Sequence, residues 1–177
     1  MMNCFWIRPV SPGNNKNYDA ILRRGVELSG NLDLKKFLKD LPLKKFQLKA
    51  DYNYQMAEFQ DGAYQSSDVP MVPRHQAGLT LSAEWESGFG VTLSERMIGS
   101  RYAINDTGNE MSPEKRYFVT DIKFSYKKQN WETFLAVNNV FDRLYNEYVA
   151  RPTGGGTATE YYAAPERNFL VGMKIKF

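Results

Sequence analysis

The stretch KFQLKADYNYQM, residues 45–56, alternates between polar and apolar side chains without a break. Successive side chains of a β-strand point to opposite faces, so this pattern predicts a long strand with one apolar and one polar face. The apolar positions are Phe46, Leu48, Ala50, Tyr52, Tyr54 and Met56, and the polar positions between them are Gln47, Lys49, Asp51, Asn53 and Gln55.

Further stretches show the same alternation, and we expect about seven strands in all. HQAGLTLSAEW (75–85) repeats the pattern in full, and FGVTLSERM (89–97) carries apolar residues at Phe89, Val91 and Leu93. At about 12 to 15 residues apiece, the strands would exceed the roughly 9 to 11 residues that a tilted strand needs to cross a bilayer. The remaining strands are expected at 23–34, at 116–126, at 131–138 with an extension through 149, and from about 165 to the last residue.

The last expected strand ends in FLVGMKIKF, residues 169–177. Reading backward from the final residue, every second side chain is apolar, and Lys176, Lys174 and Gly172 lie between them. Alternation of this kind again predicts a strand with one apolar face. The apolar residues are Phe169, Val171, Met173, Ile175 and Phe177.

The connections between the expected strands alternate in length. Short turns on one edge and long loops on the other are typical of an all-β, antiparallel, up-and-down sheet of transmembrane β-barrel strands. Tight turns are expected at 87–88 and 127–130 and a moderate turn at 35–44, whereas long loops are expected at 60–73, 103–114 and 150–164.

Aromatic side chains mark the turn edge of the expected apolar face. Amphipathic rings favour the boundary between hydrocarbon and water, so a girdle of them indicates a membrane interface. A soluble β-sandwich or lipocalin-like barrel also alternates apolar and polar residues, but it has no need to align rings beside its turns. The girdle comprises Phe46, Trp85, Phe89, Tyr126 and Trp131 together with Phe177, and a looser group toward the long loops comprises Tyr102, Tyr117, Phe118, Tyr145 and Tyr148.

Composition and charge argue against several other classes of protein. The mean hydropathy is −0.53, and no uncharged apolar run approaches the roughly 18 to 20 residues of a membrane-spanning helix. The net charge of +3 is scattered, which gives no basic patch for nucleic acid. Cys4 and His75 are the only residues of their kinds, so no metal site is expected. No grouping of Ser, His and acidic residues suggests catalysis, and no cofactor is expected.

Two segments allow more than one interpretation. The segment 35–45 places leucines and Phe37 at helical spacing among lysines and could be an interfacial helix, but Pro42 favours a short helical cap within the turn. The apolar patch at residues 5–7 is far shorter than the core of a signal peptide, about 7 to 15 residues, so no export signal is expected there.

Five features of the sequence stand out beside the alternation: RRGVEL (23–28), VPMVPRH (69–75), NNVFDRLYNEY (138–148), YYAAPERNF (161–169) and the terminal Phe177. Together they resemble the C-terminal barrel strands of TonB-dependent outer-membrane receptors. The most specific is NNVFDRLY, with Asn138, Asn139, Phe141, Asp142 and Tyr145. Asn tolerates left-handed backbone angles and Asp142 can bond its own neighbouring amides, so we expect a kink or bulge that re-aims the strand toward the outer loops.

This resemblance implies a fold and a function. The chain would have an irregular N-terminal segment at 1–18 and the C-terminal part of the receptor β-barrel domain at 19–177, an incomplete part of a barrel of about 22 strands. The family implies a location in the cell outer membrane and a receptor that imports a large, scarce nutrient such as a ferric siderophore, haem or cobalamin. The import that the resemblance implies involves no covalent chemistry.

The resemblance also implies partners. They are the lipid of the outer membrane, the TonB system, whose contact segment belongs to another part of such a receptor, and the outer-membrane assembly machinery. That machinery would recognise the terminal strand through its alternating apolar residues and Phe177. Ligand contacts could come from any of the three long loops. A self-sufficient small outer-membrane barrel with a structural or adhesion role and a soluble β-barrel binding protein are the alternatives.

Overall fold

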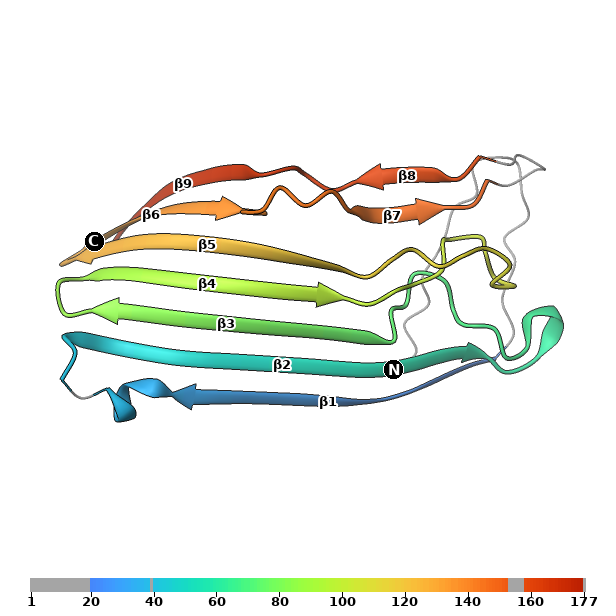
Figure 1. Cartoon of the computed structure of the whole chain (residues 1–177), viewed down its shortest axis with the longest axis horizontal. Helices are drawn as coiled ribbons and strands as arrows, with labels where there is room; N and C mark the ends of the chain where they lie inside the picture. Colours follow the sequence, from blue (N-terminus) through green and yellow to red (C-terminus); the bar gives the residue numbers. More distant parts are fainter. Residues whose placement is uncertain (1–19, 39, 153–157, 177) are drawn as a thin grey trace.

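The computed structural model describes residues 20–38, 40–152 and 158–176. Its main element is a seven-stranded antiparallel sheet in the order β1-β2-β3-β4-β5-β6-β9 (Figure 1). Each expected strand is present, which confirms the all-β, up-and-down fold predicted from the alternation. The strands are β1 (Ile21–Asp33), β2 (Leu43–Phe59), β3 (His75–Trp85), β4 (Phe89–Ile98), β5 (Tyr117–Lys128), β6 (Trp131–Asn138) and β9 (Asn168–Ile175).

The short turns lie together at one edge of the sheet and the long loops at the other (Figure 1). The turn between β1 and β2 contains a 3-10 helix, η1 (Leu34–Phe37), capped by the side chain of Asp33, so the short helical cap was predicted correctly. Between β3 and β4, Gly88 has a φ of 90°, a left-handed angle that glycine adopts without strain. Another 3-10 turn, η2 (Gly62–Tyr64), lies in the loop between β2 and β3.

The register aligns apolar residues across the whole sheet. One row of paired residues contributes an apolar side chain from every one of the seven strands, all on the same face. The neighbouring row, on the opposite face, is polar. The apolar row is Leu32, Leu48, Leu81, Leu93, Ile122, Val137 and Phe169, and the polar row is Asn31, Lys49, Thr80, Ser94 and Asp121.

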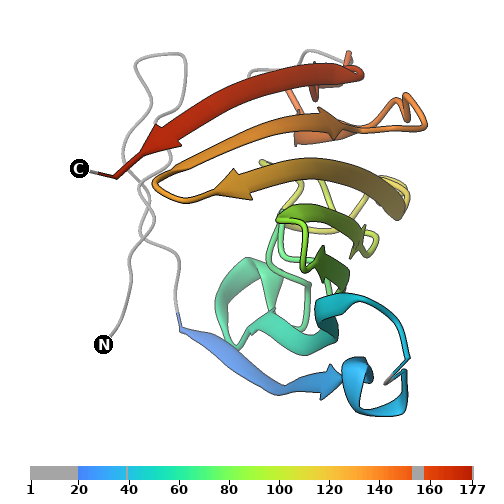
Figure 2. The ribbon, with the colours of Figure 1, turned by 90° about the vertical axis from the view of Figure 1, so that its left-hand side faces the viewer.

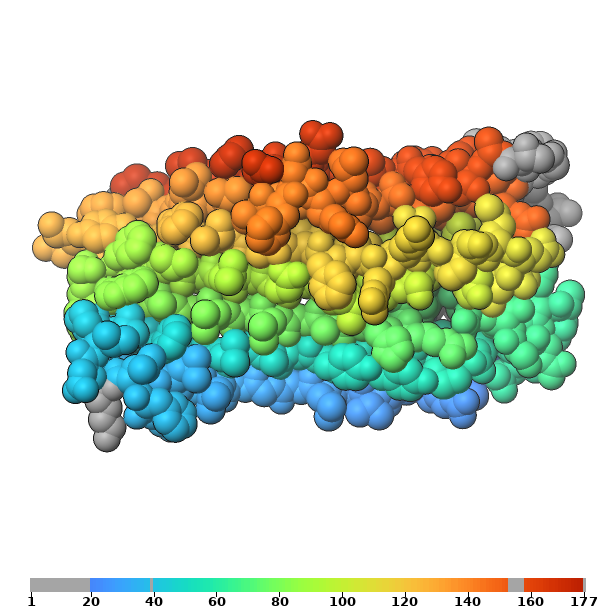
Figure 3. Space-filling model, in the orientation of Figure 1, coloured from blue at the N-terminus to red at the C-terminus, as the bar shows by residue number. Residues whose placement is uncertain are grey.

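The sheet is curved (Figure 2). The residues that line a hollow of about 380 Å³ include five from the polar face: Asp51, Thr80, Ser94, Arg96 and Asp121. The opposite face is exposed: the exposed fractions of Leu28, Leu79 and Val171 are 61%, 47% and 73%. A soluble sandwich or barrel would instead bury its apolar face, whereas an exposed apolar face opposite a polar one is typical of transmembrane barrel strands. Figure 3 shows the strands as a continuous wall from the turn edge to the loop edge.

The small core lies at the loop edge. Most fully buried apolar side chains come from the loop ends of strands and from the loops themselves. The loops therefore pack on the sheet, while no described element covers its apolar face. The buried apolar residues at this edge are Ala57, Phe59, Ala103, Tyr117, Val119, Val149 and Ala150.

Three details of the sequence prediction were wrong. The strands are not uniformly long, because β6 and β9 have 8 residues each and β4 has 10. The sixth strand does not continue through 149, since Asn139 and Asp142 take left-handed φ angles of 53° and 52° that end the extended backbone. The loop 150–164 is not wholly irregular, because β7 (Asn146–Ala150) and β8 (Glu160–Ala163) pair in a separate two-stranded sheet.

Candidate functional site at the loop edge

The break after β6 is organised by Asn139, whose side chain is buried. Its Oδ1 accepts a hydrogen bond from the backbone N of Arg143 at 2.8 Å, and its Nδ2 donates to the Arg143 carbonyl at 3.0 Å. The amide thus replaces the backbone partner that Arg143 would have in a continuous sheet. The backbone N of Asn139 donates to Asp121 Oδ1 at 2.8 Å, which fixes the break against β5.

The rest of this motif connects the break to β9. Asn138 remains in β6, and its Nδ2 donates to Asn168 Oδ1 at 2.8 Å. Asp142 does not bond its own neighbouring amides as expected: its Oδ1 accepts from the backbone N of Arg167 at 2.8 Å. The left-handed backbone angles at Asn139 and Asp142 bring the Asp142 carboxylate to the segment before β9, where it accepts from the backbone amide of Arg167. Phe141 is 76% exposed.

Arg101 ties the two-stranded sheet to the barrel wall. Its guanidinium is buried, with Nη2 donating to the carbonyls of Asn146 at 2.7 Å and Glu147 at 3.3 Å. The guanidinium carbon lies 5.3 Å from the centre of the Tyr117 ring, close enough for a cation–π contact. Tyr117 also stacks on Tyr145, and the centres of the two rings are 4.4 Å apart. Arg101 Nη1 is buried without a hydrogen-bond partner among the described atoms.

The loop between β4 and β5 is folded around Asp106, whose side chain has no exposed surface. Its carboxylate accepts from the backbone N of Glu110 at 3.0 Å and of Met111 at 3.2 Å. Arg151 Nη1 lies 3.3 Å from Asp106 Oδ1 and 2.6 Å from Glu110 Oε2. The hydrogen bond and charge of Glu110, followed by Asp106, raise the pKa of Arg151 above its ordinary value. The loop between β4 and β5 is therefore held by ion pairs to Arg151, at the start of the loop that follows β7.

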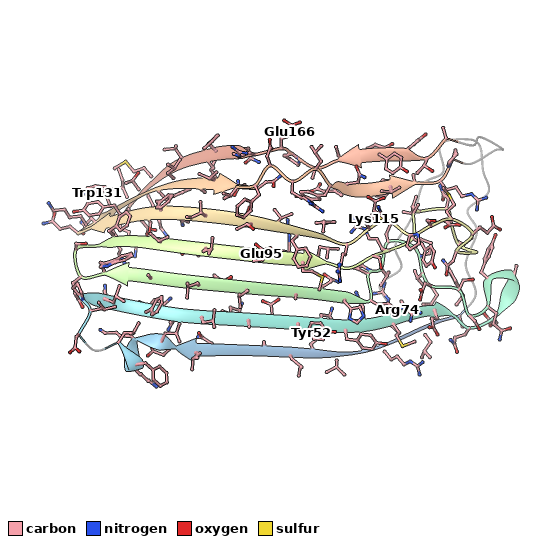
Figure 4. All side chains as sticks on the ribbon, viewed as in Figure 1. Tyr52, Arg74, Glu95, Lys115, Trp131 and Glu166 are labelled. Carbon is pink, nitrogen blue, oxygen red and sulfur yellow. The ribbon has the colours of Figure 1, made fainter. Side chains whose placement is uncertain are left out.

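The same loop is bonded to the loop between β2 and β3 through Asn109. Its Oδ1 accepts from the backbone N of Asp68 at 2.6 Å, and its Nδ2 donates to the Asp68 carbonyl at 3.0 Å. Asp68 in turn pairs with Arg74 at 2.7 Å, and this hydrogen bond is the main cause of the raised pKa of Arg74. Arg74 also reaches Glu58 at 3.3 Å and lies at the loop end of the sheet, far from Trp131 at the turn end (Figure 4).

The three long loops therefore form one connected cap. It presents charged and aromatic groups next to the polar, hollow face of the sheet, an arrangement that can bind a polar ligand. Among the described residues, no three His, Cys, Asp or Glu side chains lie close enough together to hold a metal ion. The helices that the structure describes are all too short to cross a membrane.

The predicted girdle residues lie together at the turn edge of the apolar face. The rings of Trp85 and Phe89 are 5.5 Å apart and those of Tyr126 and Trp131 are 5.6 Å apart. Phe46 pairs with Ala83, which lies on the same face of β3 as Trp85, two residues before it. Phe177, the sixth predicted girdle residue, lies outside the described residues.

The residues predicted as a terminal assembly signal share one face of β9. Phe169, Val171, Met173 and Ile175 pair in register with apolar-face positions of β6, and each is at least 51% exposed. Phe177 again lies outside the described part of the chain.

The looser aromatic group does not share one face. Phe118 lies on the apolar face, where it pairs with Met97. Tyr117 lies on the polar face and stacks on Tyr145, while Tyr148 of β7 packs edge-on against Tyr162 of β8 at 5.3 Å. The backbone carbonyl of Tyr102 accepts from the N of Met71 at 2.9 Å, which joins two loops. Only a part of this group can therefore face lipid.

Sequence reasoning missed Arg101, Asp106, Asn109 and Arg151. The run NDTGNE at 105–110 gave one usable signal, because Asn and Asp favour turns and left-handed angles, and Asn105 and Asn109 have φ angles of 66° and 53°. Arg101 gave no local signal, since its partners Tyr117 and Asn146 are distant in sequence.

Comparison with known proteins supports a family assignment. The β-barrel domain described as TonB dependent receptor-like matches residues 7–140 of the chain. The chain belongs to this family of TonB-dependent receptor β-barrels. No curated protein sequence matches the chain.

Solved structures of receptors share its fold. The ferric yersiniabactin uptake receptor FyuA of Yersinia pestis matches with a TM-score of 0.70 and 22% identity over 89% of this chain and 24% of that one. The ferric citrate transporter FecA matches with a TM-score of 0.74 and 18% identity over 87% and 24%. The ferric-catecholate import receptor Fiu of E. coli K12 matches with a TM-score of 0.67 and 23% identity over 96% and 23%. The chain thus spans about a quarter of each structure.

Proposed function

We propose that residues 19–177 form the C-terminal part of the barrel wall of an outer-membrane receptor, with 1–18 as an irregular N-terminal segment. The observation that carries this proposal is the pairing of an exposed apolar face with a hollow polar face in a member of the TonB-dependent receptor family. Lipid outside and a lined lumen inside require that arrangement.

The proposed cargo is a large, scarce nutrient of the ferric siderophore, haem or cobalamin class. The similar structures of receptors for ferric yersiniabactin, ferric citrate and ferric catecholates support the iron-chelate members of this class. The connected cap of loops would contact the ligand, and TonB would supply the energy through another part of the receptor. The protein would bind and transport without covalent chemistry.

The two outermost strands of the sheet, β1 and β9, support a larger barrel rather than a self-sufficient small one. Among the described residues, β1 and β9 each have one edge with no strand paired to it. Lipid offers no hydrogen-bond partners for backbone groups, so both edges would need further strands of the receptor. We propose a complete barrel of about 22 strands, with β9 carrying the signal for the assembly machinery.

Cysteine accessibility tests the two faces directly. With Cys4 replaced by Ser, Thr80→Cys on the polar face should react with a hydrophilic maleimide in outer membranes, whereas Leu81→Cys on the apolar face should react only after denaturation. The two positions are adjacent in β3 and differ only in the face they occupy. Reaction of Leu81→Cys with exclusion of Thr80→Cys would contradict the assigned faces, and a soluble, inward-packed barrel would instead give the expected labelling in buffer that contains neither lipid nor detergent.

The cargo class needs its own experiment. Cells that lack their iron-chelate receptors should regain growth on a ferric siderophore when they produce the receptor that contains this chain. Growth on haem or on cobalamin, tested in parallel, would identify those members instead, and failure on all three would reject the proposed cargo class.

A further inference from the structure

Glu95 interrupts the apolar face of the sheet. It lies two residues along β4 from Leu93 and therefore on the same face as the row that is apolar in all seven strands. There it pairs with Leu79 on one side and Thr120 on the other. Its neighbours along β4 on the same face are Leu93 and Met97. The alternation in FGVTLSERM therefore fails at one position, where an acid replaces an apolar residue.

The position of Glu95 is deep within the apolar face. It lies six residues beyond Phe89 of the aromatic girdle. At about 3.3 Å per residue and a tilt of about 45°, this corresponds to about 14 Å from the girdle, near the middle of an apolar band about 25 Å tall. An ionisable group at this depth is costly in lipid and is a candidate functional site for that reason.

One described side chain satisfies one of the two carboxyl oxygens. The hydroxyl of Thr120 donates to Glu95 Oε2. Within the described ranges, Glu95 forms no ion pair, and its Oε1 accepts no hydrogen bond from a side chain. Around it, Leu79 and Leu93 are 47% and 41% exposed, so they form an open apolar surface next to an unsatisfied acceptor.

We propose that Glu95 and Thr120 form a binding site for the amine group of a membrane-dissolved amphiphile. The unsatisfied oxygen would accept from the ammonium group, Thr120 would hold the carboxyl in place, and the alkyl chain would lie along Leu79 and Leu93. Charge complementarity selects an amine, because a carboxyl in hydrocarbon needs a donor that arrives through the lipid. The proposal rests on the proposed function, since it requires that this face contacts lipid.

Carbodiimide coupling in outer-membrane vesicles that contain the receptor tests the site. Dicyclohexylcarbodiimide enters lipid and adds to a carboxylic acid: the carboxyl oxygen bonds to the central carbon while the acid proton moves to nitrogen. A neutral amine that is bound nearby then attacks the carbonyl carbon, forms an amide and releases dicyclohexylurea. We expect dodecylamine to couple to Glu95, while water-borne ethanolamine does not, and Glu95→Gln should abolish the product.

Two variants separate a built site from simple exposure to lipid. Thr120→Val should lower the coupling of dodecylamine by about fivefold, the factor expected for one lost hydrogen bond. Leu81→Glu in the Glu95→Gln background places the carboxyl on the same face without Thr120, and this double variant should couple no better than Thr120→Val. Equal coupling of dodecylamine in the unaltered receptor, in Thr120→Val and in the variant with Glu at position 81, or no coupling at Glu95, would overturn the proposal.

A polar-face acid distinguishes this failure from failure of the proposed function. Asp51 lines the hollow, so a water-soluble carbodiimide should couple it to ethanolamine. If Asp51 behaves in this way but Glu95 does not couple to dodecylamine, only the amine site is rejected. If Asp51 couples from lipid and Glu95 from water, the faces are reversed and the proposed function fails with it.

Discussion

At the scale of single residues, two glycines of this sheet differ in what they would tolerate. A Cβ at Gly172 of β9 would overlap the ring of Phe134, which in turn lies under the Lys123 ammonium at 4.6 Å. A Cβ at Gly30 of β1 would meet nothing within 4 Å. Phe134 therefore packs on the bare backbone of Gly172, a contact that only glycine permits.

Replacement of Gly172 by Ala should destabilise the receptor by about 1 to 3 kcal/mol, because the Phe134 ring must move and loses its contacts. Urea unfolding in lipid vesicles measures the change in the free energy of unfolding. Gly30→Ala is the matched control and should be neutral or slightly stabilising. The double variant Gly172→Ala with Phe134→Leu should recover most of the loss. Equal losses of stability in Gly172→Ala and Gly30→Ala would refute the assigned contact.

At the scale of elements, Asn109 is the main link between two loops that are separated in sequence. Asn109→Ala removes both hydrogen bonds to the backbone of Asp68. We expect local opening of the 60–74 loop without loss of the sheet, seen as faster hydrogen exchange at the Asp68 amide, by about tenfold or more. Asn105→Ala is the control, because its side chain bonds the Arg151 carbonyl instead and should leave Asp68 protected. Equal exchange at Asp68 in both variants would contradict this role.

The elements also show how far the sequence could be interpreted. The seven strands of the main sheet were predictable because alternation is a local property, visible within β2 or β3 alone. The β7–β8 hairpin was not, since it depends on the left-handed angle at Asn139 and on the buried Arg101, whose partners lie in other elements. Residues of the loop cap, such as Asp106 and Asn109, gain their roles only when the fold brings them to their partners.

At the scale of the whole molecule, the apolar and polar faces should respond in opposite ways to the same charge. Leu93 lies in the row that is apolar in all seven strands, whereas Ser94, the next residue, pairs with Thr80 and Asp121 on the polar face. Arg at Leu93 would project into hydrocarbon and should cost about 2 to 4 kcal/mol, while Arg at Ser94 would face water beside a carboxylate and should cost close to nothing.

The fraction of folded receptor in outer membranes, together with its urea unfolding in lipid vesicles, measures both variants. Leu93→Arg should lower the folded fraction and shift the unfolding midpoint to lower urea, and Ser94→Arg should leave both near the values of the unaltered protein. A soluble barrel would also reject Arg at Leu93, but its midpoint would be the same in lipid and in detergent-free buffer. A membrane barrel wall instead requires that the penalty depend on lipid, because the surface that Leu93 shares with its six row partners faces hydrocarbon and not a protein core.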